Sequence, residues 1–167
     1  FFAGTYTTAY LNNNGNLSFS AVLGTYTPDA FPGAPQPMIA PYWADVHTGT
    51  APASIFGCPG GIAESVCPFT GILTGACSAA TAGSCQDNNV WYYLEPGRIV
   101  ATWDRVGYFE CHDDLRMSFQ LVLTAPTDAC SAPGDFDVEF RFNRCEWETG
   151  DASGGSGGFG GTPAQAG

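Results

Sequence analysis

Lysine is absent from this sequence, and basic residues of any kind are scarce. Five arginines stand against sixteen acidic residues, which gives a formal net charge of −11 over 167 residues. Nucleic acids and anionic lipids are recognised through clustered positive charge, so this balance argues against both kinds of partner. A cationic partner, Ca²⁺ or simply an acidic surface facing solvent is compatible with it.

Long apolar runs and helical patterns are also missing. No run of eighteen apolar residues occurs, so we expect no membrane insertion. No stretch of useful length has the helical period, whereas glycine and proline supply 22 and 12 residues, which favours short elements joined by many turns. The chain starts at Phe1 without a basic leader or an initiator Met, so we expect a piece of a longer precursor.

Several segments carry the patterns of β-strands. Residues 5–11 and 17–21 flank an Asn-Gly turn, the typical signal of a hairpin. Residues 90–94 and 99–106 flank Glu95-Pro96-Gly97-Arg98, which is the sequence of a type II turn. Residues 38–46 are apolar but interrupted by Pro41, which predicts a bulged strand or an edge strand.

Two later segments alternate with period two. One face of the first carries Met117, Phe119, Leu121 and Leu123. In the second, Phe136, Val138, Phe140 and Phe142 alternate with Asp135, Asp137, Glu139 and Arg141, which predicts a strand with one buried and one solvated face. We therefore expect a mainly β fold over residues 1–167, a single antiparallel β-sandwich-like domain with long loops.

The seven cysteines predict a disulfide framework in an oxidising, extracellular compartment. Residues 47–89 form a small-residue segment that we interpret as an inserted excursion stapled by its own disulfides. Proximity in sequence favours the pairs Cys58–Cys67 and Cys77–Cys85 within it. Cys111 and Cys145 flank the two alternating strands at one end and are the favoured third pair, which leaves Cys130 unpaired or intermolecular.

Candidate chemical sites are weak in this sequence. His47 and His112 lie in expected loops, and no serine sits in a nucleophile elbow, so we expect no catalytic residues. Asn14, Asp45 and Asp151 lie beside turns with accessible backbone oxygens, and they are the candidate ligands of a structural Ca²⁺ ion. Ordinary turns and helix caps are the alternative interpretation of these residues.

Motifs spread along the chain resemble one known family. They are Leu11-Asn12-Asn13-Asn14-Gly15-Asn16-Leu17-Ser18-Phe19, Pro37-Met38-Ile39-Ala40-Pro41-Tyr42-Trp43-Ala44-Asp45-Val46, Trp147-Glu148-Thr149-Gly150-Asp151 and the final Gly160–Gly167 segment. Together they resemble the NIDO domain, an extracellular module named after nidogen. The resemblance implies that the glycine-rich end is a family element rather than a flexible linker, and that both chain ends fall inside the module. The cysteine-rich excursion resembles that of secreted bacterial members of the family.

The resemblance implies an extracellular or cell-surface, non-enzymatic role in cell–matrix adhesion. We expect the loops to present protein- or glycan-binding residues, with Phe31, Phe56 and Phe69 as candidate anchors. Packing of these rings onto the domain itself is the alternative. Two other functions stay open: a subunit or decoration of an extracellular filament or sheath, with possible self-assembly, and a carbohydrate-active enzyme.

Overall fold

The computed structural model describes residues 6–48, 66–68, 88–127, 131–132 and 134–167. In order, the described strands are β1 (Tyr10–Asn12), β2 (Asn16–Ser18), β3 (Met38–Ile39), β4 (Val46–His47), β5 (Val66–Pro68), β6 (Asn89–Glu95), β7 (Arg98–Tyr108), β8 (His112–Thr124) and β9 (Asp137–Cys145). The described residues contain one short 3₁₀ helix, η2 (Asp151–Ser153). No helix among them is long and apolar enough to cross a membrane. The expected mainly β fold is confirmed.

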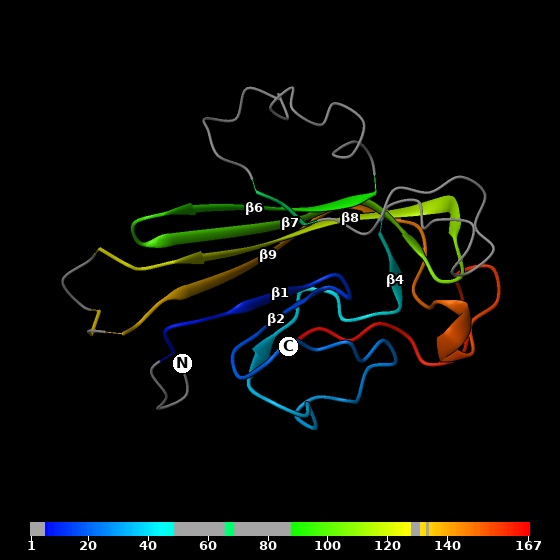
Figure 1. Cartoon of the computed structure of the whole chain (residues 1–167), viewed down its shortest axis with the longest axis horizontal. Coiled ribbons are helices and arrows are strands. Elements are labelled where there is room, and N and C mark those ends of the chain that lie inside the picture. Colours follow the sequence, from blue (N-terminus) through cyan, green and yellow to red (C-terminus); the bar gives the residue numbers. More distant parts are fainter. Residues whose placement is uncertain (1–5, 49–65, 69–87, 128–130, 133) are drawn as a thin grey trace.

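Two sheets make up the described part of the domain (Figure 1). The small sheet has the order β1-β2-β3, and the large sheet has the order β5-β6-β7-β8-β9 with β4 paired to the far end of β7. The pairings are antiparallel except for that of β5, which runs parallel to β6 with Val66 opposite Val90. The expected excursion over residues 47–89 therefore contributes an edge strand to the large sheet.

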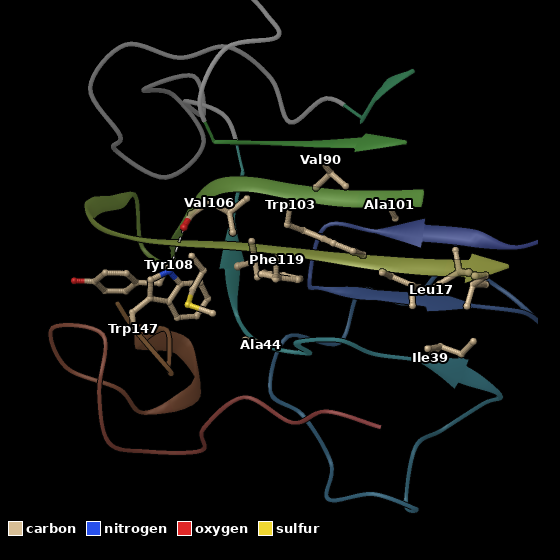
Figure 2. Packing of buried hydrophobic residues seen from close by; sticks show 14 residues of the cluster. Leu17, Ile39, Ala44, Val90, Ala101, Trp103, Val106, Tyr108, Phe119 and Trp147 are labelled. Carbon is tan, nitrogen blue, oxygen red and sulfur yellow. Dashed lines mark hydrogen bonds between the residues drawn. The ribbon is translucent and has the colours of Figure 1, made fainter. Parts of the chain in front are cut away.

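The hydrophobic core lies between the two sheets. Leu17 and Ile39 of the small sheet pack with buried residues of β7 and β8, among them Trp103 and Phe119 (Figure 2). The rings of Trp103 and Phe119 stack with centroids 4.9 Å apart. The Trp103 indole N–H donates a 2.9 Å hydrogen bond to the backbone oxygen of Asn13, so the polar edge of this buried ring is satisfied.

The segment around Pro41 does not form one strand. Met38–Ile39 belongs to the small sheet and Val46–His47 to the large sheet, so the expected single bulged strand is divided between the two sheets. A proline cannot donate to a strand ladder, which explains why the pairing stops there. The connection between β3 and β4 thereby becomes the crossing point from one sheet to the other.

The glycine-rich C-terminal segment packs along that crossing. Trp43 and Gln165 form an antiparallel bridge, with N···O distances of 2.8 and 2.9 Å in the two directions. Ala40 and Gly167 exchange two further backbone hydrogen bonds of 2.7 and 3.0 Å. Figure 1 shows this segment, in red, returning beside β3. The segment is therefore an ordered part of the domain and does not form a linker.

The expected burial of β8 is confirmed, whereas on the expected apolar face around β9 only Phe136 and Phe140 are partly buried against the core. Met117, Phe119 and Leu121 on β8 are at most 2% exposed. On β9, Val138 and Phe142 are 44% and 49% exposed, although their partners on β8 are core residues. The reason is the position of β9 at the edge of the large sheet, where none of its residues enters the fully buried core.

Candidate interaction surface

Asp45 is buried and serves as a structural acceptor. One carboxylate oxygen accepts a 3.1 Å hydrogen bond from the backbone N–H of Ala152, in the 3₁₀ helix η2. Burial raises the pKa of Asp45 to about 6, while the hydrogen bonds from the N–H groups of Ala152 and Ser153 act in the opposite direction. A Cβ atom on Gly150 would lie 2.6 Å from this carboxylate, so the packing around it is tight.

The three candidate metal ligands do not form a site with converging oxygens. Asp151 lies on η2, and its carboxylate is 3.0 Å from the Nε2 atom of His112 in an exposed pair. The Asn14 side-chain amide donates to the backbone oxygens of Gly24 and Thr25, at 3.5 and 3.4 Å. Among the described residues, no three His, Cys, Asp or Glu side chains gather as metal ligands do. In the structure Asn14 and Asp45 instead form hydrogen bonds with backbone groups, and Asp151 pairs with His112.

The predicted Cys111–Cys145 disulfide is wrong. Cys145 is a free and exposed thiol. Cys111 is disulfide-bonded, so its partner is a cysteine other than Cys145. The strand register explains the error, because Cys145 pairs with Met117, six positions along from Cys111. At about 3.3 Å per residue, this offset of about 20 Å is far beyond the reach of a disulfide.

The remaining predicted cysteines and two of the predicted aromatic anchors cannot be placed. Cys58, Cys77, Cys85, Cys130, Phe56 and Phe69 lie outside the described residues, as does the side chain of Cys67. The third anchor, Phe31, is partly buried, and its ring meets that of Trp43 edge-on at 6.0 Å. Phe31 therefore packs onto the domain itself, as the alternative interpretation held.

An open apolar groove of about 450 Å³ lies where the β6–β7 turn approaches the small sheet. Its lining residues are Tyr6, Phe19, Glu95, Gly97, Arg98, Ile99, Leu123, Thr124, Ala125 and Phe136. The rings of Tyr6 and Phe19 lie 5.1 Å apart in the groove. Glu95 and Arg98 supply charge at 3.6 Å from each other across the turn. The groove thus combines an aromatic lining with one ion pair.

Sequence reasoning missed this groove because its lining comes from separate parts of the chain. Tyr6 and Phe19 flank the first hairpin, whereas Ile99, Leu123 and Phe136 belong to or adjoin three segments of the second half. Only the packing of the small sheet on the large one brings these residues together. The one available signal was the excess of aromatic residues, 14% of the chain.

The fold and the motifs agree with a comparison against known families. The sequence profile of the Nidogen-like domain matches residues 7–66 and 86–167. The chain therefore belongs to the Nidogen-like (NIDO) domain family, and it is an extracellular domain. The unmatched residues 67–85 fall inside the excursion that the sequence predicted as an insertion.

Alpha-tectorins of vertebrates are similar to this chain over its whole length. The mouse and human proteins are each 30% identical over 177 residues, and the chicken protein is 32% identical over 171 residues. The chain spans 7% of the length of each of these relatives. The expected likeness to secreted bacterial members finds no support in them. No solved structure matches the chain at comparable significance.

Proposed function

We propose that this domain is an extracellular interaction module that contributes to cell–matrix adhesion by binding a protein partner, without catalytic activity. The open aromatic groove between the two sheets carries this proposal. The few residues that carry most of the binding energy in protein interfaces are enriched in Trp, Tyr and Arg, and the groove lining includes Tyr6 and Arg98. Membership of an extracellular family supports the proposal, because a groove on an extracellular domain is accessible to matrix proteins.

The roles of the ionisable residues support binding rather than catalysis. Asp45 accepts backbone hydrogen bonds, and His112 pairs with Asp151 at the surface. General acid–base catalysis needs such groups to face a shared site that a substrate can enter. These side chains instead hold the C-terminal segment against the sheets, and none of them lines the groove.

The chemistry of the groove favours a protein segment as its occupant. Its lining is mainly apolar and aromatic, which suits one or two large apolar side chains of a partner. Glu95 and Arg98 in its lining offer one acceptor and one donor group for orientation of the partner. A glycan would need more hydrogen-bonding groups than this lining supplies.

Retention of the labelled domain on a reconstituted basement-membrane extract tests the proposal. Tyr6→Ala removes an exposed groove residue, and Tyr26→Ala is the matched control, because Tyr6 and Tyr26 are 37% and 47% exposed and only Tyr6 lines the groove. We expect Tyr6→Ala to weaken retention about ten-fold and Tyr26→Ala to leave it unchanged.

Treatment of the extract identifies the class of partner. We expect protease to remove the binding sites and glycosidases to leave them. Absence of retention of the unmodified domain, or equal retention by the Tyr6 variant, would contradict the proposal. Retention lost only with glycosidases would replace the protein partner by a glycan. Turnover of a polysaccharide by the unmodified domain would favour the alternative of a carbohydrate-active enzyme.

A further inference from the structure

Strand β9 presents a long free edge. It is the last strand in the order β5-β6-β7-β8-β9, and in the described part of the chain it pairs on one side only, with β8. Eight of its nine residues are exposed. The backbone N–H and C=O groups on its outer side therefore point to solvent, and such an edge can accept another strand.

The residues of this edge are complementary to those of a second copy. In an antiparallel pair related by a two-fold axis through Phe140, residues whose numbers add to 280 face each other across the new ladder. Glu139 then faces the Arg141 of the other copy, and Val138 faces its Phe142, each twice by symmetry. Glu139 and Arg141 are two residues apart, and Val138 and Phe142 are four residues apart. Side chains separated by an even number of residues point to the same face of a strand, so the members of each pair lie on one face.

In this register, the side chains on both faces of β9 meet complementary side chains of the second copy. On the core side, Val138 and Phe142 are left 44% and 49% exposed, and each would cover the other. On the opposite side, Glu139 and Arg141 already pair at 2.7 Å within one copy, and both are about half exposed. The second copy adds a further opposite charge to each, which forms an alternating group of four charges.

Charged side chains on an edge strand commonly prevent pairing, but this arrangement does not repel its own copy. Like charges placed directly opposite each other across a ladder destabilise the pairing, whereas opposite charges stabilise it. A register centred on Phe140 brings opposite charges together at both symmetry-related positions. The register shift in the β8–β9 ladder between Ser118 and Phe119 marks where the regular strand ends, so pairing is confined to residues 137–143.

We propose that β9 is a self-association edge, at which a second copy of this chain adds antiparallel about Phe140 and joins two large sheets into one. This association goes beyond the proposed matrix binding and does not depend on it. It also does not use the free thiol. Cys145 lies five residues from the axis at Phe140 in each copy, so the two thiols lie about 34 Å apart at about 3.4 Å per residue.

Sedimentation equilibrium of the chain over a concentration series up to about 1 mM tests the proposal. Every protein carries Cys145→Ser, so that thiol linkage cannot cause association. We expect Glu139→Arg and Arg141→Glu each to weaken dimerisation at least about ten-fold, because each turns two attractive pairs into repulsive ones. The double exchange Glu139→Arg/Arg141→Glu restores opposite charges and is expected to return the affinity to within about three-fold.

Asp29→Arg is the matched control for charge. Asp29 is exposed and lies in the loop before β3, and its reversal changes the net charge as much as Glu139→Arg does. Both changes lower the overall negative charge, so weaker dimers with Glu139→Arg alone point to the local pairing. Circular dichroism and the thermal midpoint of each variant verify that it is folded.

Hydrogen exchange locates the contact. We expect backbone amides of residues 137–143 to gain protection as concentration rises, and to lose this gain in Glu139→Arg. A monomer at every concentration, or protection gained elsewhere, would overturn the proposal. Failure of the double exchange to restore the dimer would overturn the register. We expect the monomeric Glu139→Arg variant to be retained on the matrix extract as the unmodified domain is. This measurement distinguishes a failure of the self-association proposal from a failure of the proposed matrix binding.

Discussion

Asp45 is the residue that most clearly couples two distant parts of the chain. Its carboxylate accepts a hydrogen bond from Ala152, 107 residues further along, and its own backbone oxygen accepts a 3.1 Å hydrogen bond from Phe109. The side chain is 4% exposed. A carboxylate in such a place loses most of its hydration, and two backbone N–H groups replace only part of it.

The stability of the folded protein should therefore depend on the ionisation of Asp45. Its pKa is raised by burial from 3.8 to about 6, so the folded state binds the proton more tightly than the unfolded state does. Stability from this group is fully present below about pH 4 and is lost as the pH rises through about 6. The loss is on the order of 3 kcal/mol.

Asp45→Asn removes this titration and keeps an oxygen that can accept from Ala152. We expect the free energy of unfolding of the variant, relative to the unmodified protein, to rise between pH 4 and pH 7. Urea denaturation at several pH values measures this difference. Asp29→Asn, at an exposed position, should show no such trend. A constant difference between Asp45→Asn and the unmodified protein across this range would contradict the assignment.

The β1–β2 hairpin shows how one backbone conformation positions an element. Gly15 has φ +78°, a value that favours glycine over residues with a Cβ. A Cβ atom on it would lie 1.8 Å from the backbone oxygen of Tyr42. Tyr42 follows Pro41 in the crossing between the two sheets, so the turn of the hairpin packs directly on this crossing.

Gly15→Ala should therefore destabilise the domain strongly. Both the left-handed conformation and the collision with Tyr42 oppose the methyl group, and we expect a loss of at least about 3 kcal/mol in the free energy of unfolding. Gly24→Ala is the control, because nothing lies within 4 Å of a Cβ at that glycine. Equal unfolding midpoints in urea for the two variants would show that the turn is not packed as described.

The elements were predictable where local chemistry decides them. Asn-Gly at the first turn and Pro96-Gly97 at the second give hairpins, and Gly97 has the φ of +78° that a type II turn needs. Alternation also located β8 and β9 correctly. It did not reveal that β9 is an edge strand, because period two reports which residues share a face and not what covers that face.

The site was less predictable than the elements for a related reason. The groove needs Tyr6 and Phe136 to meet, and sequence patterns do not report how two sheets pack on each other. The Cys111–Cys145 error has the same origin, since the β7–β8 hairpin extends past the end of β9 by a distance that the sequence does not encode locally. Register and sheet packing are properties of the assembled domain.

At the scale of the whole molecule, the number of cysteines becomes informative. The chain has seven, and Cys145 is a free thiol while Cys111 is disulfide-bonded. Removing Cys145 from the count leaves six, an even number that can be fully paired. An extracellular compartment favours such pairing. We therefore predict one reactive thiol per chain in the native protein.

Thiol titration and peptide mapping check this prediction. An alkylating reagent applied to the folded protein without a reductant should modify one cysteine per chain, and the modified peptide should contain Cys145, because its side chain is exposed at the end of β9. Cys145→Ser should leave no reactive thiol. Modification of Cys130 instead would show that Cys130, as predicted from the sequence, is the unpaired cysteine. Since Cys145 stands at the end of the β9 edge and not at its centre, its alkylation should also leave any dimer formed through Phe140 intact.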